Sequence, residues 1–162
     1  MMADDDDDPL ASDGYSHRIT ISGNPLAMKR LGPNLRVTIT ATAEDGTMLS
    51  SHDVGAIVDT GSQSSCISLR MVPRMVGAHE GRRTISHVFG REDERTLRGV
   101  LRFQNGVQFT RDFAVLAHLD HYDVLIGRDI LKHCRMYMDL GKGEFRLYFS
   151  SDVVSLRPAS LV

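Results

Sequence analysis

The chain has 162 residues, enough for one domain with a sizeable core and too few for two ordinary domains. Apolar residues make up 41% of the chain and charged residues 25%, which excludes a fibrous repeat and a wholly disordered protein. The formal net charge is -2 at pH 7, but the acidic run Asp4–Asp8 alone accounts for its sign. We therefore expect residues 1–14 to form a disordered acidic arm outside a slightly basic fold.

The chain shows no targeting or cross-linking signal. It contains no apolar stretch of about 18 residues, and aspartates stand near the N-terminus where a signal peptide has positive charge and an apolar run. Cys66 and Cys134 are too few for a disulfide framework and too far apart for a metal-type pair. We expect a cytoplasmic protein with no membrane partner, in which both cysteines are reduced and buried.

The first half of the chain predicts strands. Residues 18–21 alternate between polar and apolar, and residues 35–41 are apolar at every second position, which indicates a half-buried strand. The turn-forming residues 44–46 allow residues 47–58 to return as its partner. Residues 77–95 are polar and punctuated by glycine, and we expect a mobile hairpin there.

The second half continues in strands. Residues 97–103 and 107–117 flank Asn105-Gly106, a strong hairpin signal, and residues 136–149 predict a last hairpin. Only residues 129–135 predict a helix. We therefore expect an all-β domain over residues 15–150, a small closed or sandwich-like barrel with one short helix near the C-terminus, followed by a tail over residues 151–162.

The clearest functional signal is an apolar strand, residues 56–58, that runs directly into Asp59, Thr60 and Gly61. A buried strand rarely finishes in an ionisable group unless a turn or a site uses it. A plain turn, in which Asp59 accepts hydrogen bonds from nearby amides, is the alternative.

A second signal lies in residues 121–131, where an apolar strand runs into Gly127 and then a helical turn. A glycine there lets another loop pass close to the backbone. We expect Asp129 to cap the helix by accepting amide hydrogen bonds, and we favour that role over Asp123 or Asp129 as a second catalytic carboxylate.

These two motifs, at this separation and in an all-β context, resemble those of the retropepsin-like aspartic proteases, single-domain relatives of pepsin that act as homodimers. The resemblance covers roughly residues 35–149. Residues 123–140 look especially like the retropepsin-like domains of bacterial proteins and of eukaryotic ubiquitin-shuttle proteases. The resemblance implies the small closed barrel of the retropepsin type.

The resemblance also implies roles for individual residues. Asp59 would be the catalytic aspartate, Thr60 the hydroxyl that ties two active-site loops together, and Gly61 a position of close approach. Structural roles at the site fall to Leu125, Gly127, Arg128 and Asp129. Two carboxylates that share one proton can act as base and acid toward a single water. Because the chain has one Asp-Thr-Gly, the pair requires a second copy of the chain, and it needs no metal or organic cofactor.

Substrate-binding residues are expected beside the aspartate and at the tip of the 77–95 hairpin: Ser62, Gln63, His87, Val88, Phe89, Gly90 and Ile126. Retroviral enzymes usually have alanine and an acid at the positions of Ser62 and Gln63, so Arg128 lacks its usual ionic partner. Residues 70–111 hold nine arginines and four acidic residues, which favours substrates with acidic residues near the cut.

Other functions fit the sequence less well. The basic stretch has few aromatic residues for base stacking, so we expect no nucleic-acid partner. His118, His121 and His133 lack the spacing of a metal site, and no serine has the surroundings of a nucleophile elbow. We predict a homodimeric aspartic endopeptidase whose water is activated by one Asp59 from each subunit, with a shared interface sheet built from residues 18–21 and 136–149. The alternative is a catalytically silent module of the same fold that serves in binding or dimerisation.

Overall fold

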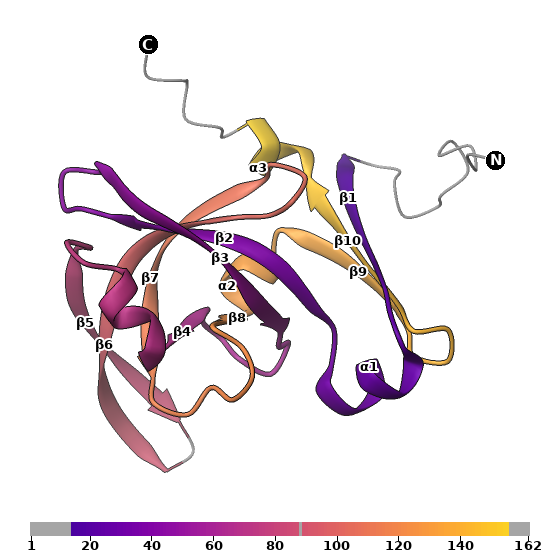
Figure 1. The fold of residues 1–162 in the computed structure, drawn as a ribbon, viewed down its shortest axis with the longest axis horizontal. Coiled ribbons are helices and arrows are strands. Elements are labelled where there is room, and N and C mark those ends of the chain that lie inside the picture. The colour runs from indigo at the N-terminus through magenta and orange to yellow at the C-terminus, as the bar shows by residue number, and fades with distance from the viewer. Residues whose placement is uncertain (1–13, 88, 156–162) are drawn as a thin grey trace.

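The computed structural model describes residues 14–87 and 89–155 (Figure 1). The acidic arm predicted for residues 1–14 therefore lies outside the described residues, except for Gly14, and so do residues 156–162 of the predicted tail. No helix in the described ranges is long and apolar enough to cross a membrane.

The main sheet closes into a six-stranded barrel. Its strand order is β2-β3-β8-β4-β7-β6, and a further pairing of β2 with β6 closes the ring. The six strands are β2 (Asn34–Thr42), β3 (Met48–Val58), β4 (Cys66–Ser68), β6 (Gly90–Arg102), β7 (Gln108–Leu116) and β8 (Val124–Ile126). β5 (Glu80–His87) pairs with β6 outside the ring. The predicted small closed barrel is confirmed.

Turn residues set the register of the barrel hairpins. Between β2 and β3, the Asp45 carboxylate accepts a hydrogen bond from the Thr47 amide at 2.9 Å, and Gly46 has φ +86°. Between β6 and β7, Asn105 Oδ1 accepts from the Val107 amide at 3.2 Å, and Gly106 has φ +87°. Both turns need a residue with positive φ, which glycine adopts at little cost. The alternating pattern of β2 then places its apolar side chains inside the barrel.

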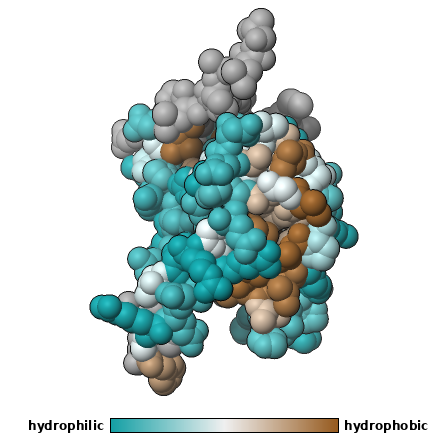
Figure 2. Space-filling model, turned by 90° about the vertical axis from the view of Figure 1, so that its left-hand side faces the viewer, coloured by the Kyte–Doolittle hydropathy of each residue, from teal (hydrophilic) through white to brown (hydrophobic). Residues whose placement is uncertain are grey.

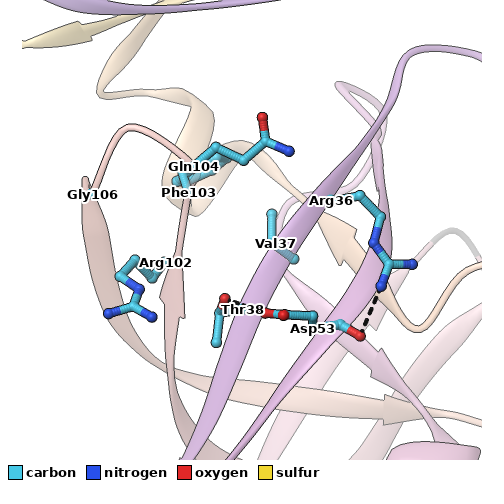
Figure 3. A pocket seen from close by; sticks show the side chains of 8 residues that line it. All are labelled: Arg36, Val37, Thr38, Asp53, Arg102, Phe103, Gln104 and Gly106. Atoms are coloured by element: carbon cyan, nitrogen blue, oxygen red, sulfur yellow. Dashed lines mark hydrogen bonds between the residues drawn. The ribbon is translucent and has the colours of Figure 1, made fainter.

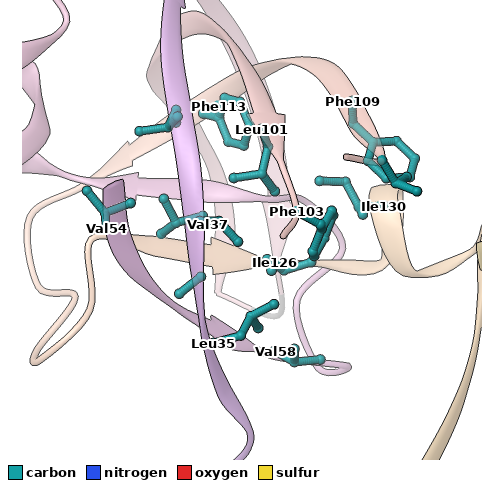
Figure 4. Close-up of a cluster of buried hydrophobic side chains, with 14 of the residues drawn as sticks. Leu35, Val37, Val54, Val58, Leu101, Phe103, Phe109, Phe113, Ile126 and Ile130 are labelled. Atoms are coloured by element: carbon teal, nitrogen blue, oxygen red, sulfur yellow. The ribbon is translucent and has the colours of Figure 1, made fainter. Parts of the chain in front are cut away.

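The core fills the barrel (Figure 4). It also includes Ile19, Phe145, Leu147 and Phe149 of a second sheet. The Phe103 ring packs on Phe109 with centroids 6.1 Å apart and on Phe149 with centroids 4.8 Å apart. Phe149 belongs to β10, so this aromatic cluster joins the two sheets.

The second sheet has three antiparallel strands in the order β1-β10-β9 and lies beside the barrel (Figure 1). Its strands are β1 (Tyr15–Ser22), β9 (Cys134–Asp139) and β10 (Glu144–Ser150). The residues predicted to form an interface sheet therefore do come together in one sheet. Met136 and Met138 on β9 are 40% and 53% exposed.

The prediction of a single helix over residues 129–135 is wrong. The helix at that place, α2 (Arg128–Leu131), is shorter, and β9 begins three residues later. The structure also contains α1 (Pro25–Leu31), the 3-10 helix η2 (Leu69–Arg74) and α3 (Ser151–Ser155). α3 lies in the predicted tail, yet its Val153 is buried against the core.

Candidate active site

The parallel pairing of β3 with β8 brings the two sequence motifs together. Ile57 is aligned with Leu125, and Val58 with Ile126. Asp59 follows directly, and its amide donates a hydrogen bond to the Ile126 carbonyl at 3.0 Å. Parallel strands end at the same edge of a sheet, so residues 59–65 and 126–129 run side by side there. We call these two segments the paired loops.

Backbone hydrogen bonds fasten the paired loops to each other. The Arg128 amide donates to the Ser62 carbonyl at 2.9 Å, and the Asp129 amide donates to the Gln63 carbonyl at 3.1 Å. Gly127 lies where the loops approach most closely, since a Cβ atom there would be 2.6 Å from the carbonyl carbon and oxygen of Ser64. The expected close approach at Gly127 is present, and no residue with a side chain fits without moving the backbone.

Ser65 forms the buried centre of this arrangement. Its hydroxyl donates to Asp129 Oδ1 at 2.7 Å and accepts from the Gly127 amide at 3.0 Å, and its own amide donates to the same carboxylate oxygen at 2.9 Å. Ser65 is fully buried. The sequence did not single out Ser65 for this role, because the polar run around it does not reveal which hydroxyl points inward.

The predicted helix cap at Asp129 needs correction. Gly127 is the N-cap of α2 and makes no side-chain hydrogen bond. Asp129 lies inside the helix, where Oδ1 accepts from the Ile130 amide at 3.0 Å as well as from Ser65. Its carboxylate therefore joins α2 to the other loop. The guanidinium of Arg111 lies beside it, with 3.8 Å between Nε and Asp129 Oδ2.

Arg128 binds the other loop through a carbonyl. Its Nη1 donates to the Thr60 carbonyl oxygen at 3.2 Å. Retroviral enzymes usually have an acid at the position of Gln63, which would be the ionic partner of Arg128. In this chain a backbone oxygen takes the place of that acid as the partner of Arg128. Six of the residues predicted to be structural or catalytic lie within this one hydrogen-bonded unit: Asp59, Thr60, Gly61, Gly127, Arg128 and Asp129.

Asp59 occupies the open side of the paired loops. Its side chain is half-buried, and Oδ1 accepts the Gly61 amide at 2.8 Å. Thr60 and Gly61 are exposed. A carboxylate fixed in this way can take up or give up a proton. Among the residues that the structure describes, no group of three His, Cys, Asp or Glu side chains could hold a metal ion.

An apolar wall extends from Asp59 across the outer face of the barrel. Cys66, Ala114 and Leu125 pack together there, with Ile57, Leu116 and Leu119 at the margin. Burial raises the pKa of the Cys66 thiol to about 11, which keeps it protonated and uncharged at neutral pH. Ile126 points to the opposite face and is fully buried in the barrel core. Its neighbour Leu125 lies on the wall. A role for Ile126 in binding substrate stays a prediction, and its burial in the core does not favour it.

The β5–β6 hairpin projects from the barrel beside this wall. Figure 2 shows it at the bottom of the molecule, with hydrophilic sides, a hydrophobic end and a hollow between it and the body. His87 is aligned with Gly90 at the tip, Gly90 has φ +140°, and Phe89 is 94% exposed. Val88 lies outside the described residues. A role for the tip in binding substrate stays a prediction, as do the roles of Ser62 and Gln63.

A separate pocket of about 510 Å³ opens on β2, β3 and the β6–β7 turn (Figure 3). Arg36, Asp53 and Arg102 are its charged lining residues. Arg36 donates to the Asp53 carbonyl at 3.0 Å, and Thr38 donates to the Asp53 carboxylate at 2.6 Å. Asp53 lies six residues before Asp59, about 20 Å along β3 at about 3.3 Å per residue. None of the predicted site residues lines this pocket.

Comparisons with known proteins identify the family. A search of curated proteins found no match. Among solved structures, the chain is similar to EIAV protease complexed with the inhibitor HBY-793, at 18% sequence identity and a TM-score of 0.43, over 62% of this chain and 85% of that one. The family model for retroviral aspartyl protease matches residues 30–139, which include β2 to β9 and both paired loops. Because that match spans more than half of the sequence, the chain belongs to the retroviral aspartyl protease family.

Proposed function

We propose that the protein is a homodimeric aspartic endopeptidase in which Asp59 from each of two copies activates one water molecule. The observation that carries this proposal is the fastening of the paired loops, because it fixes the backbone of Asp59 while leaving the carboxylate partly open. If the Asp59 carboxylate served only to close a turn, that turn would not need residues 126–129 bound across it.

The chemistry needs two carboxylates close together. At about 3 Å two aspartates cannot both ionise, so the pair holds one proton. The ionised carboxylate takes a proton from water, whose oxygen forms a bond to the peptide carbonyl carbon, while the protonated one donates to the carbonyl oxygen. Proton transfer to the amide nitrogen then allows the carbon–nitrogen bond to break, which releases a carboxylic acid and an amine.

A two-fold axis near Asp59 would supply the second carboxylate. The exposed Thr60 hydroxyl is available to a second copy, as the family resemblance requires. In the described part of the three-stranded sheet, β1 and β9 are edge strands, and β9 exposes Met136 and Met138. Exposed edges and apolar side chains favour association with another chain. We therefore assign the dimer interface to this sheet.

Asp59→Asn tests the catalytic proposal. We expect cleavage of a diverse peptide mixture to fall at least about 10³-fold, because asparagine cannot transfer a proton as a carboxylate does. The substituted side chain keeps an oxygen that accepts the Gly61 amide, so the melting temperature should not change. Cuts are mapped by mass spectrometry from acid to neutral pH. Equal activity in the two proteins would refute the proposal, and two inactive but dimeric proteins would favour a binding module.

Met138→Lys tests the interface. The substitution places a charge on the exposed apolar part of β9, so we expect sedimentation to show a weaker dimer and activity per molecule to fall on dilution. Met48→Lys is the matched control, because Met48 is 52% exposed at the far end of β3 and Met138 is 53% exposed. If both variants remain dimeric and active, the interface lies elsewhere.

A further inference from the structure

The pocket on β2, β3 and the β6–β7 turn lies where two strands of the barrel part. The pairing of β2 with β6 ends at Thr38 and Arg102, which are aligned with each other. Beyond that point β2 continues through residues 34–37, β6 gives way to the turn at residues 103–106, and both segments line the pocket. On its other side Thr38 is aligned with Asp53 of β3. The pocket is therefore built on the outer face of three neighbouring strands.

Two arginines dominate the charge of this pocket. Figure 3 shows Arg36 and Arg102 on opposite sides of Thr38 and Asp53. Both arginines are exposed, so a molecule in solvent can reach them. Arg36 donates one hydrogen bond, from Nη2 to the Asp53 carbonyl. The Arg102 side chain makes no hydrogen bond or ion pair with the residues that the structure describes. The pocket thus offers accessible guanidinium donors that the described part of the protein leaves unused.

Asp53 contributes the negative charge of the lining. Its carboxylate already accepts the Thr38 hydroxyl at 2.6 Å. Two guanidinium groups and one carboxylate give the lining a net charge of +1. Guanidinium groups bind carboxylates through paired, charge-assisted hydrogen bonds. The pocket is therefore suited to a carboxylate, which would bind at the arginines and away from Asp53.

Arginines of the neighbouring three-stranded sheet differ from those of the pocket. Arg135 lies over the Tyr15 ring, 4.2 Å from its centroid. Arg146 lies 4.9 Å from the centroid of the Tyr137 ring and donates to the Glu144 carboxylate. An anion at that sheet would have to share these cations with the partners that they already have. The pocket arginines are the better site for an added carboxylate.

The start of β1 is fastened beside the pocket. Asn105, between the lining residues Gln104 and Gly106, donates from Nδ2 to the His17 carbonyl at 2.9 Å. His17 stands at a bulge in β1 and has φ +55°, in the left-handed region that residues other than glycine rarely adopt. The bond from Asn105 therefore holds the strand at its irregular point, next to the turn that lines the pocket.

The sequence before β1 carries the acidic run Asp4–Asp8. Asp8 lies nine residues before His17, and nine residues of extended chain span up to about 30 Å, so the run can reach the pocket. A tether this short keeps the run near the pocket at an effective concentration on the order of millimolar. Single ion pairs between exposed groups are weak, so the tether is what makes their formation favourable.

We infer that the pocket between Arg36 and Arg102 binds carboxylates of the acidic run Asp4–Asp8 of the same chain. One carboxylate pairs with Arg102 and another with the nitrogens of Arg36 that do not bind the Asp53 carbonyl. Any member of the run can occupy either place, because all five are aspartates. The inference is independent of the proposed protease activity. Asp53 lies about 20 Å along β3 from Asp59, so the bound run leaves the paired loops open.

NMR spectra of the full chain test this inference, through its backbone amides and its arginine side chains. The wild type is compared with a variant that carries Asp→Asn at all five positions 4–8. We expect the largest differences in chemical shift at Thr38, Arg102 and Gly106, because a carboxylate bound at Arg102 changes the electric field at its neighbours. The differences should largely disappear at about 1 M salt, where the Debye length is about 3 Å.

Two arginine substitutions provide the matched comparison. In Arg102→Gln, the five Asp→Asn changes should shift the resonances of Thr38 and Gly106 at most half as much as they do in the wild type, because one of the two cations is gone. Arg82→Gln removes an exposed arginine of the β5–β6 hairpin instead. There the differences should be as large as in the wild type. Differences that persist unchanged in Arg102→Gln, or that centre on the three-stranded sheet, overturn the inference.

A free peptide of five aspartates, acetylated and amidated, probes the same site from solution. Added to the variant with five asparagines, it should reproduce the shifts at the pocket with a Kd on the order of millimolar, since binding of the tethered run requires an affinity that matches its effective concentration. Failure to bind the pocket at that concentration overturns the inference. Wild-type differences that decrease on dilution would assign the pocket to the acidic run of a second copy, and binding within one chain would then be wrong.

Discussion

The paired loops carry Asp59 and the β5–β6 hairpin projects from the same barrel, but different forces hold the two regions. Backbone amides, the Ser65 hydroxyl and the Asp129 carboxylate fasten the paired loops from two sides. The hairpin extends past the barrel, where its strands pair with each other and carry charged side chains. Asp59 thus stands on backbone that has little freedom to move, whereas the hairpin, for which a role in binding substrate is a prediction, can change its side chains at small structural cost.

Gly127→Ala should have the largest effect on stability. The new Cβ atom would lie 2.6 Å from the Ser64 backbone, so the two loops must separate and break the hydrogen bonds between them. We expect a loss of about 3 kcal/mol or more in the free energy of unfolding, together with loss of activity. Urea titration measures the first and peptide cleavage the second.

Gly23→Ala serves as the control for that substitution. A Cβ atom at Gly23 meets no heavy atom within 4 Å. Its stability should therefore remain within about 0.5 kcal/mol of the wild type. If Gly127→Ala is as stable as Gly23→Ala, the paired loops are not held as tightly as the contacts indicate.

Ser65→Ala should have the next largest effect. It leaves the buried Gly127 amide without an acceptor and removes one donor from Asp129. An unsatisfied buried group costs about 1–3 kcal/mol, and the displaced loop should also lower kcat. Ser50→Ala, which removes an exposed hydroxyl that donates to the Arg74 carbonyl, should have little effect on either quantity. Equal losses in the two variants would show that Ser65 has no special role.

The sequence predicted the barrel because local signals fixed most of its hairpins. The alternation in β2 and the Asn105-Gly106 turn each determine a register within a few residues. The meeting of Asp59 with Gly127 was also predictable, but through resemblance to a family, since nearly seventy residues separate the two. Physical signals in the sequence predict a contact best when the contacting residues lie close together in the chain.

Other features depend on the fold. β8 is buried on both faces, so a run of three apolar residues could not show that Leu125 rather than Ile126 faces the site. The arginines looked like a basic surface because their acidic partners lie eleven or more residues away, and only the register of β5, β6 and β7 reveals the pairs.

The sequence contains a capping signal for α1, although our predictions did not include this helix. Asn24 caps the helix by accepting from the Leu26 amide at 2.9 Å, Pro25 occupies the first turn, and Gly32 ends the helix with φ +76°. Asparagine before proline and a glycine seven residues later is a regular helix pattern. The helix is only seven residues long and buries Met28 alone, so hydrophobic periodicity could not reveal it.

The smallest effect is expected at the exposed pair of the hairpin, Glu80 and Arg95. The hydrogen bond from Arg95 lowers the pKa of the Glu80 carboxyl below its usual 4.5. The contribution of the pair to stability is therefore present above pH 4.5 and lost as the pH falls through the lower pKa of the folded state.

Both side chains are in contact with water, which screens the interaction, so Glu80→Gln should change the melting temperature at neutral pH only slightly. That slight difference should vanish at low pH, and the peptide preference should stay that of the wild type. A large loss of stability in Glu80→Gln would show that the hairpin is held by its charges as firmly as the paired loops are held by their backbone, and the contrast between the two regions would then fail.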